Sequence, residues 1–540
     1  MNVASLLPHF AQSSPDKIAI FAPKKNLWSK ITYESISFKK LDERSNQFAH
    51  YFLASGLKAG DRILVFVKPC THFSVITFGL FRAGLIPVFL DPGMGTRNLL
   101  NAIKQIKPTG LIGETVMSLA RLIYSDYFKS ITVHLNVNQL KKMTFEESLP
   151  LLMKEVEPHD SAAVLFTSGG TGIPKGVLYT HHIFNTQRSM LQKMFSLTSS
   201  DVDLPGFPLF GLFTITMGMT SVIPLMNPSK PSKANAKYLV KNIKDHQATF
   251  IAGSPAIWKN LAIYCIKHKI TLPSVKYLVM FGAPVPIKLH KDLQSFLPSG
   301  DTYTPYGATE CLPVTCISGK ELINQMAEKM NSGHGTCIGK PCPDVTIKIL
   351  PITDCDLASE KNANWLEKQQ MGEICVKSQT VTPLYVDMPE KTKAAKIKGE
   401  EENVLWHRMG DLGYKDEDGH IWFCGRKSHR LDIQEIQGNV TIAPIPYENM
   451  INELPHVSRC ALIAPKQNEK VIPTLIVVPL NTLSTQEKRE LSNKIEQALL
   501  AHPIPLKINH IFYRKSLPVD GRHNIKIDRI KLAKIFEGQI

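Results

Sequence analysis

Short apolar runs alternate with amphipathic segments along the first four hundred residues, and this alternation is the feature that most constrains the fold. One segment, 73–83, predicts a helix that ends before Gly84, and the runs predict strands at 62–67, 86–90, 161–167 and 277–282. These runs are mainly apolar and do not alternate with polar residues, which is typical of parallel strands that are covered on both faces. The order of strands and helices therefore favours α/β layers with largely parallel sheets.

The length of the chain calls for more than one domain. It has 540 residues, whereas single cores stop growing near ~250–300 residues. A hairpin is expected at 411–424, and a short polar, basic segment follows it at 425–430. We therefore predict a large N-terminal α/β domain over 1–425 and a small α+β domain over 426–540. The charge run 388–403 indicates a solvated loop.

Composition excludes several classes of protein. Hydrophobic residues make up 43% and charged residues 20%, which is ordinary for a globular enzyme and not for a disordered or disulfide-stapled chain. Ten scattered cysteines without a CxxC pair disfavour a zinc site and suit the reduced thiols of a cytoplasmic protein. The net charge of +16 comes without an aromatic-basic reader motif, so nucleic acid is not an expected partner.

The stretch 206–226 carries no charge and is long enough to span a bilayer. It contains two prolines and several glycines, and a lipid-exposed helix broken in this way would leave backbone groups unpaired. We therefore interpret it as a buried strand and helix. The alternative, a membrane-embedded acyl carrier, depends on this stretch alone.

A loop rich in glycine and hydroxyl groups follows the expected strand at 161–167 and is the strongest chemical signal. Glycines allow successive backbone N–H groups to point into one concavity that suits phosphate oxygens. A lysine adds a point charge, and the spacing differs from the G-x-x-x-x-G-K-[ST] loop of P-loop proteins. A plain glycine-rich turn is the alternative. The candidate nucleotide-binding residues are Thr167, Ser168, Gly169, Gly170, Thr171, Gly172 and Lys175.

This loop resembles the phosphate loop of the adenylate-forming superfamily, which includes acyl-CoA synthetases, luciferases and peptide-synthetase adenylation domains. The family pattern is T-S-G-[TS]-T-G-x-P-K-G, and this chain departs from it only at Gly170. The resemblance extends over nearly the whole chain. It implies the fold of that superfamily, with a small C-terminal lid domain, and it implies ATP and Mg²⁺ as cofactors.

Further motifs follow in the family's order. Tyr306-Gly-Ala-Thr-Glu310 resembles Y-G-x-T-E, in which the tyrosine stacks on adenine, the threonine (here Thr309) contacts the α-phosphate and the glutamate holds Mg²⁺. The residue types suit those roles, since a hard cation prefers carboxylate oxygen. By resemblance, the loop that borders adenine is Gly282, Ala283 and Pro284.

Three polar residues near the expected domain boundary and the C-terminus also match family positions. Asp411 would accept both ribose hydroxyls, and Arg426 would reach the same ribose. Lys526 would be the mobile catalytic lysine, which bridges the substrate carboxylate and the α-phosphate. A surface lysine is the alternative for Lys526. A non-catalytic nucleotide-binding scaffold would lack this lysine or Glu310, and both are present.

Local departures from the superfamily indicate a branch. Gly211 stands where many acyl-CoA synthetases have histidine, which we expect to open space beside the carboxylate site. Ser428 takes the place of the usual hinge aspartate, and 430–441 departs from the segment that lines the pantetheine tunnel in thioester-forming members. The resemblance is to the β-lactone synthetases of bacterial long-chain olefin biosynthesis. The expected substrate pocket consists of Phe207, Phe210, Gly211, Gly282 and Gly307.

The resemblance implies adenylation of a long-chain 2-alkyl-3-hydroxy acid, followed by attack of its own β-hydroxyl to give a β-lactone, AMP and pyrophosphate. A long-chain fatty acyl-CoA ligase or fatty acyl-AMP ligase is the alternative. His429 and His523 are candidate bases for the hydroxyl, although for each of them a surface histidine is the favoured interpretation. The sequence leaves open whether the enzyme works at a membrane surface or in a complex with other olefin-pathway enzymes, and leaves its oligomeric state open.

Overall fold

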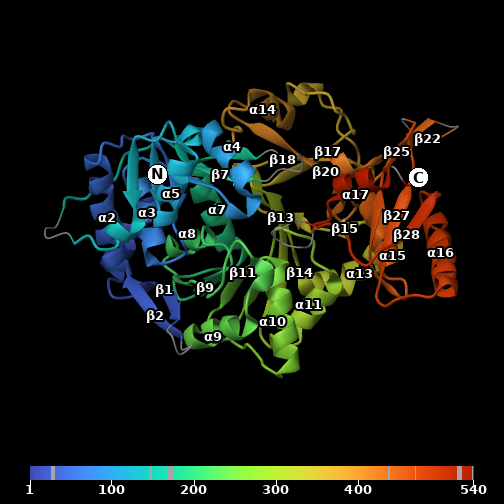
Figure 1. Cartoon of the computed structure of the whole chain (residues 1–540), viewed down its shortest axis with the longest axis horizontal. Coiled ribbons are helices and arrows are strands. Elements are labelled where there is room, and N and C mark those ends of the chain that lie inside the picture. The colour runs from blue at the N-terminus through green and yellow to red at the C-terminus, as the bar shows by residue number, and fades with distance from the viewer. Residues whose placement is uncertain are drawn as a thin grey trace.

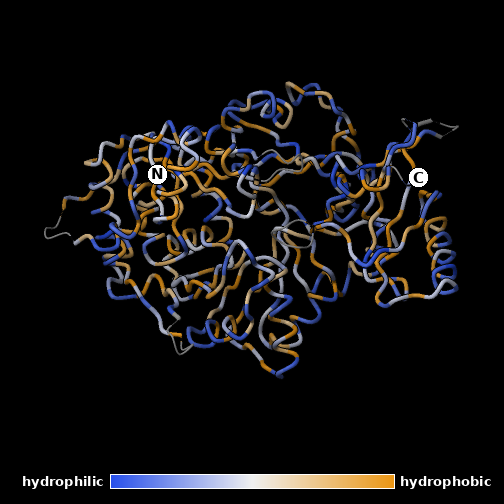
Figure 2. Tube along the Cα trace, in the orientation of Figure 1, coloured by the Kyte–Doolittle hydropathy of each residue, from blue (hydrophilic) through white to orange (hydrophobic). Residues whose placement is uncertain are grey.

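A computed structural model describes the chain except for residues 26–30, 145–148, 168–173, 436–437, 469, 520–525, 538 and 540. Three sheets and their helices form the larger part of the molecule, and a smaller part lies at one end (Figure 1). Hydrophobic segments are concentrated in the inner strands, and hydrophilic segments follow the outer loops and helices (Figure 2).

The first sheet has the described order β6-β5-β3-β4-β7-β8 and is parallel except for the last pair. The expected strands at 62–67, 86–90 and 161–167 are confirmed within it, and the expected helix at 73–83 is α3. Its strands are β3 (Arg62–Phe66), β4 (Ile86–Phe89), β5 (Gly110–Gly113), β6 (Val133–Asn136), β7 (Ser161–Thr167) and β8 (Lys175–Thr180). The helices of this part are α1 (Leu7–Ser13), α2 (Phe38–Ala54), α3 (Thr71–Arg82), α4 (Thr96–Ile106), α5 (Thr115–Ile123), α6 (Val137–Leu140) and α7 (His181–Met194).

The second sheet has the described order β16-β14-β13-β12-β11-β9-β10-β1-β2 and is parallel from β13 to β1. Its strands are β1 (Ile18–Lys25), β2 (Ile31–Ser37), β9 (Val202–Pro205), β10 (Thr220–Val222), β11 (Phe250–Gly253), β12 (Tyr277–Met280), β13 (Asp301–Ala308), β14 (Cys311–Ser318) and β16 (Lys340–Pro341). Helices in this part are α8 (Phe210–Ile215), α9 (Ala236–His246), α10 (Pro255–Lys267), α11 (Ile287–Gln294), α12 (Gly319–Glu321) and α13 (Ala327–Lys329).

The uncharged stretch 206–226 is a buried helix and strand, α8 and β10, as expected. In the described part of the chain, no helix is both long and apolar enough to cross a bilayer. The short length of α8 follows from the prolines and glycines that surround it.

The third sheet is antiparallel in each of its described pairs. The expected hairpin at 411–424 is β20–β21. The strands of this sheet are β15 (Thr336–Cys337), β17 (Thr346–Leu350), β18 (Gly372–Lys377), β19 (Lys396–Lys398), β20 (Leu405–Lys415) and β21 (Ile421–Arg426). The interpretation of 388–403 as a solvated loop was wrong, since it contains α14 (Pro389–Ala395) and β19, and pairing of β19 with β20 buries Lys396.

The C-terminal part is a small α+β layer with its own core. Its strands are β22 (Leu431–Glu435), β23 (Gly438–Ile442), β24 (Val457–Ile463), β25 (Lys466–Gln467), β26 (Lys470–Val471), β27 (Thr474–Pro479) and β28 (His510–Tyr513). Its helices are α15 (Pro444–Asn452), α16 (Thr485–Leu500) and α17 (Arg529–Phe536). This part docks on the rest through His502, whose Nε2 lies 3.0 Å from the Gly333 carbonyl oxygen, and Asn449, whose Nδ2 donates to the Gly335 carbonyl at 3.1 Å.

Candidate active site

The first cluster of the site joins β13 to the β20–β21 hairpin. Tyr306 lies on β13, and its hydroxyl donates to Oδ2 of Asp411 at 2.6 Å. Arg426 ends β21 and donates from Nη1 to the other carboxylate oxygen, also at 2.6 Å. β20 and β21 pair so that Asp411 and Arg426 are opposite each other. The three residues predicted to hold the nucleoside are therefore in direct contact.

Charge at this cluster is balanced around a buried carboxylate. Only 4% of Asp411 is exposed, and burial raises the pKa of its carboxyl, while Arg426, Tyr306 and Lys526 act to lower it. The Asp411 charge in turn raises the pKa of the Arg426 guanidinium. Lys526 is exposed, and its ammonium lies close enough for its charge to act on Asp411. The predicted lysine and the predicted ribose-binding carboxylate thus lie in one site.

The second cluster surrounds Glu310 at the bend between β13 and β14. The Tyr385 hydroxyl donates to Oε1 of Glu310 at 2.7 Å, and the backbone N–H of Thr382 donates to the Glu310 carbonyl oxygen. Among the described residues, Oε2 of this carboxylate has no hydrogen-bond partner. A carboxylate held at one oxygen with the other available suits a hard cation such as Mg²⁺.

The glycine-rich loop connects β7 to β8, and its ends are described. Thr167 and Lys175 are paired across the two antiparallel strands, so the loop closes a hairpin. The Lys175 ammonium lies 4.8 Å from the centre of the Tyr385 ring, beside the Glu310 cluster. Burial lowers the pKa of Lys175, against the opposing effect of Glu310. The predicted residues Ser168, Gly169, Gly170, Thr171 and Gly172 lie outside the described residues.

Other predicted residues occupy nearby turns. The carbonyl oxygen of Thr309 accepts a hydrogen bond from the Tyr179 hydroxyl at 2.7 Å. Gly307 is exposed on β13. Gly282, Ala283 and Pro284 follow β12, and Gly282 has a φ of +89°, a conformation that favours glycine.

The expected substrate pocket is partly closed by packing. The rings of Phe207 and Phe210 lie 5.3 Å and 4.8 Å from the ring of Phe281, which the sequence analysis missed. The expectation that Gly211 opens space was wrong, because a Cβ there would lie 2.9 Å from Oγ of Ser221. The cavity beside Gly211 has a volume of about 20 Å³. This glycine therefore serves close packing of α8 on β10.

Two buried basic residues near Glu310 were also missed. Lys396 and His407 are opposite each other on β19 and β20, and 8% and 3% of them is exposed. Burial lowers the pKa of Lys396 to about 8, although Glu310 acts to raise it. Burial and the Lys396 charge hold the pKa of His407 well below its usual value. Because the lysine sits in a charge run, the sequence gives no local signal of its burial.

The candidate base His429 follows the expected hinge residue, Ser428, which is exposed. Burial, Arg529 and Arg426 lower the pKa of His429 to about 4, so its imidazole is neutral at physiological pH. His429 therefore lies within electrostatic reach of the nucleoside cluster. The other candidate, His523, is outside the described residues.

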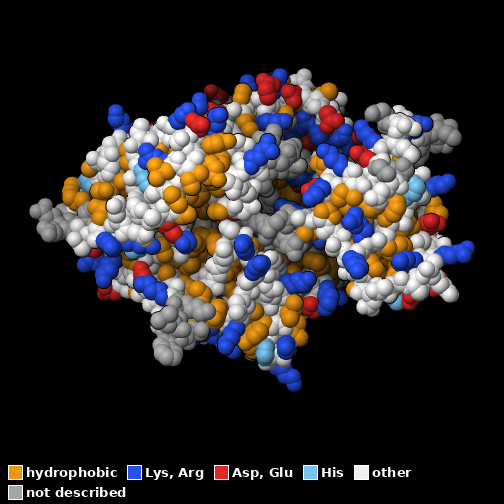
Figure 3. Space-filling view, viewed as in Figure 1, with side chains coloured by type: hydrophobic (Ala, Val, Ile, Leu, Met, Phe, Trp, Pro, Cys, Tyr) orange, Lys and Arg blue, Asp and Glu red, His pale blue; other side chains and the backbone are white. Residues whose placement is uncertain are grey.

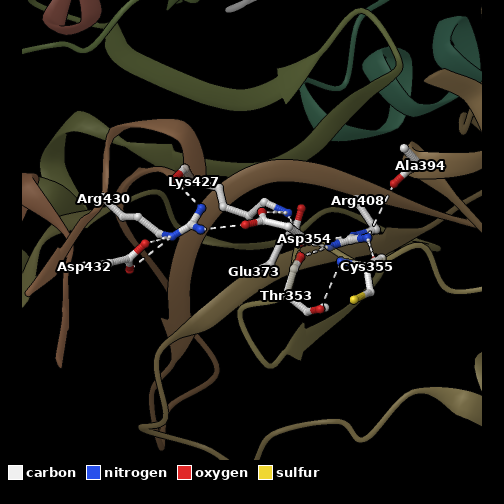
Figure 4. A network of polar contacts seen from close by, with 9 residues as sticks. All are labelled: Thr353, Asp354, Cys355, Glu373, Ala394, Arg408, Lys427, Arg430 and Asp432. Atoms are coloured by element: carbon white, nitrogen blue, oxygen red, sulfur yellow. Dashed lines mark hydrogen bonds and ion pairs between the residues drawn. The ribbon is translucent and has the colours of Figure 1, made fainter. Parts of the chain in front are cut away.

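An ion-pair network flanks Ser428 (Figure 4). Arg408 donates two hydrogen bonds to the buried Glu373 carboxylate, and Lys427 lies 3.2 Å from the same carboxylate. Beyond Ser428, Arg430 pairs with Asp354 at 2.7 Å. The pairs with the buried Glu373 carboxylate lie before Ser428 in sequence, whereas Arg430 pairs with Asp354 across it and with Asp432 after it.

Comparison with known proteins places this arrangement in a family. The model of the AMP-binding enzymes matches residues 7–386. The chain therefore belongs to the AMP-binding enzyme family, whose members form adenylates. The solved O-succinylbenzoate coenzyme A synthetase from Bacillus subtilis, in complex with ATP and magnesium ion, shares the fold with a TM-score of 0.75 and 20% identity, over 98% of each chain.

Relatives of higher sequence identity indicate a subgroup within the AMP-binding enzyme family. An olefin beta-lactone synthetase of Stenotrophomonas maltophilia (strain K279a) is 35% identical, over 98% of this chain and 97% of its own. An olefin beta-lactone synthetase of Xanthomonas campestris pv. campestris is 34% identical over the same shares of the two chains. Within the family, the chain groups with the olefin beta-lactone synthetases, as the sequence motifs predict.

Proposed function

We propose that the protein uses ATP to convert a long-chain 2-alkyl-3-hydroxy acid into a β-lactone, with release of AMP and pyrophosphate. The observation that carries the proposal is the convergence of Tyr306, Asp411, Arg426 and Lys526 in one site of a chain related over its full length to olefin beta-lactone synthetases.

In the first step, a carboxylate oxygen of the acid attacks the α-phosphorus of ATP, and the bond to pyrophosphate breaks. Asp411 and Arg426 orient the ribose, and Tyr306 offers its ring to adenine. Lys526 enters from the C-terminal part, so its ammonium can offset charge that builds on the α-phosphate in the transition state. Its position supports this role, since its charge already acts on Asp411 in the same site.

Glu310 would hold Mg²⁺ through Oε2, because Tyr385 occupies the other oxygen. The metal, when bound, would neutralise phosphate charge. Lys175 lies on the same side of the site and would contact the outer phosphates. Tyr385 orients the carboxylate, which prevents it from turning toward the ammonium groups nearby.

In the second step, the β-hydroxyl oxygen attacks the carbonyl carbon of the acyl-adenylate. The bond from that carbon to the AMP oxygen breaks, AMP leaves, and the hydroxyl proton passes to a base or to water. The nucleophile is tethered to its target, which reduces the entropic cost of attack. Burial, Arg529 and Arg426 lower the pKa of His429 to about 4, which makes its imidazole a weak base at physiological pH, so we infer that water accepts that proton.

The test compares a long-chain 2-alkyl-3-hydroxy acid with the same acid lacking its hydroxyl. With ATP and Mg²⁺ but no coenzyme A, we expect β-lactone, AMP and pyrophosphate from the hydroxy acid. The deoxy acid should stop as bound acyl-adenylate, and added coenzyme A should change little. Mass spectrometry of the organic extract reads the result. A thioester that requires coenzyme A, formed without lactone, would establish the acyl-CoA ligase alternative instead.

The setting of the reaction follows from its chemistry. All ten cysteines are free, which supports the cytoplasmic location expected from the sequence. We also propose that 1–425 and 426–540 act as core and lid, with Ser428 at the hinge.

A two-tailed acid has very low solubility in water, so the enzyme must take it from a membrane surface or from a protein that delivers it.

A further inference from the structure

The helix α5 presents an apolar face that nothing in the described chain covers. Its exposed apolar residues recur at helical spacing on one side, and none of its residues is buried. The exposed fractions are 67% for Val116, 58% for Leu119, 76% for Leu122 and 63% for Ile123. In Figure 3, hydrophobic side chains gather on the face of the molecule around α5. Exposed patches of this kind mark interaction sites.

The surroundings of this face are basic. Residues 96–143 contain seven lysines and arginines and two acidic residues. Both acidic residues are engaged, since Glu114 pairs with Lys68 at 2.6 Å and Asp126 with Lys129 at 2.7 Å. The remaining basic residues give the region an excess of positive charge. The exposed members of this set are Arg97, Lys104, Lys107, Lys129, Lys141 and Lys142.

Aromatic residues lie where α5 ends. Tyr124 is 38% exposed, and the Lys104 ammonium lies 5.9 Å from the centre of the Tyr127 ring. Tyrosines beside lysines at the border of an apolar face are typical of helices that lie in a lipid headgroup layer. A protein partner of ordinary composition would not require this excess of cations.

We propose that the exposed face of α5 and the basic residues around it form a docking surface for an anionic phospholipid bilayer. The choice of a bilayer as the occupant rests in part on the proposed function, because a two-tailed acid partitions into membranes. α5 begins after β5, at the same edge of the sheet where β7 leads into the glycine-rich loop, since these strands are parallel through β3 and β4. The edge of the first sheet at which β5 and β7 end would thus face the lipid layer.

The experiment measures sedimentation of the full-length protein with vesicles. One set contains phosphatidylcholine and phosphatidylglycerol, and the other contains phosphatidylcholine alone. The test variant is Leu122→Asp with Ile123→Asp. The matched control is Ile263→Asp with Ile266→Asp on α10, where the two side chains are also exposed, at 59% and 48%.

We expect the unaltered protein and the α10 variant to bind the anionic vesicles, more weakly at high salt and on phosphatidylcholine alone. The α5 variant should lose about tenfold or more of its partition, because both apolar area and charge complementarity are lost. Pyrophosphate exchange with a dispersed shorter-chain acid should be the same for all three proteins, which shows that each is folded.

Two results would overturn the proposal. One is absence of vesicle binding by the unaltered protein, or equal binding by the α5 and α10 variants. The other is a change of oligomeric state in the α5 variant by light scattering without a change in vesicle binding, which would assign the face to a second copy of the chain. Neither result depends on whether lactone or thioester is the product, so this test and the test of the function fail separately.

Discussion

Replacement of Asp411 by asparagine should weaken ATP binding while keeping the shape of the site. Each oxygen of the carboxylate already accepts one hydrogen bond at 2.6 Å, from Tyr306 and from Arg426. Each oxygen has a further lone pair, so two ribose hydroxyls can be accepted together. An amide has one accepting oxygen and no charge, so it loses at least one bond to the ribose and weakens the other.

The magnitude follows from the value of those bonds. A hydrogen bond to a charged group contributes ~1.5–3 kcal/mol. The variant loses one of the two hydrogen bonds from the ribose and keeps the other in a weaker, uncharged form, so the loss of ATP-binding free energy should be about 2–3 kcal/mol. This corresponds to a dissociation constant for ATP about 30- to 140-fold higher. Titration calorimetry measures it. Asp416→Asn, on the same hairpin but bonded to Trp422 instead, is the matched control and should bind ATP normally. An unchanged dissociation constant for Asp411→Asn, with normal thermal unfolding, would show that the ribose lies elsewhere.

Three further outcomes are expected. Lys526→Ala should abolish substrate-dependent exchange of pyrophosphate into ATP but leave ATP binding largely intact, and near-normal exchange would contradict its assigned role. Burial raises the pKa of Asp203 to about 7, above its unfolded value, so its ionisation destabilises the fold increasingly as pH rises from about 4 to 7. At pH 8 the Asp203→Asn variant should therefore be more stable than the unaltered protein, by on the order of 2–4 kcal/mol, and the difference should be smaller at pH 5. Urea unfolding at both pH values measures this. Arg408→Met should cost about 3 kcal/mol of stability, at the low end for a broken buried pair because Lys427 still reaches Glu373, and an unchanged unfolding midpoint would refute that estimate.

The strands and the motif residues could be predicted because each depends on local chemistry. A mainly apolar run such as 62–67 predicts a buried strand. A lysine beside a glycine-rich loop suits phosphate, and a carboxylate suits a metal ion. The contact of Tyr306 with Asp411 joins residues far apart in sequence, and only the resemblance to a family suggested it. The other contacts of the site depend on how distant segments pack together.

Lys396 shows this limit most clearly. The segment 388–403 around it is rich in charged residues, which favours a solvated loop, and the burial of Lys396 arises only when β19 pairs with β20. The expectation that Gly211 opens space was wrong for a related reason. The missing side chain was read as empty space, but Ser221 of a neighbouring strand fills it. Both errors concern contacts between segments, which a single sequence does not display.

The docking of His502 and Asn449 on residues 333–335 bears on how the enzyme avoids wasting ATP. An acyl-adenylate is readily hydrolysed, and an enzyme that must admit an external thiol has to open its site while the intermediate is still bound. Here the second nucleophile arrives inside the substrate, so one closed arrangement can serve both steps. Under the proposed function, opening would follow ring closure and coincide with product release. Little adenylate should then be lost to water during turnover of the hydroxy acid, and AMP and lactone should form in equal amounts.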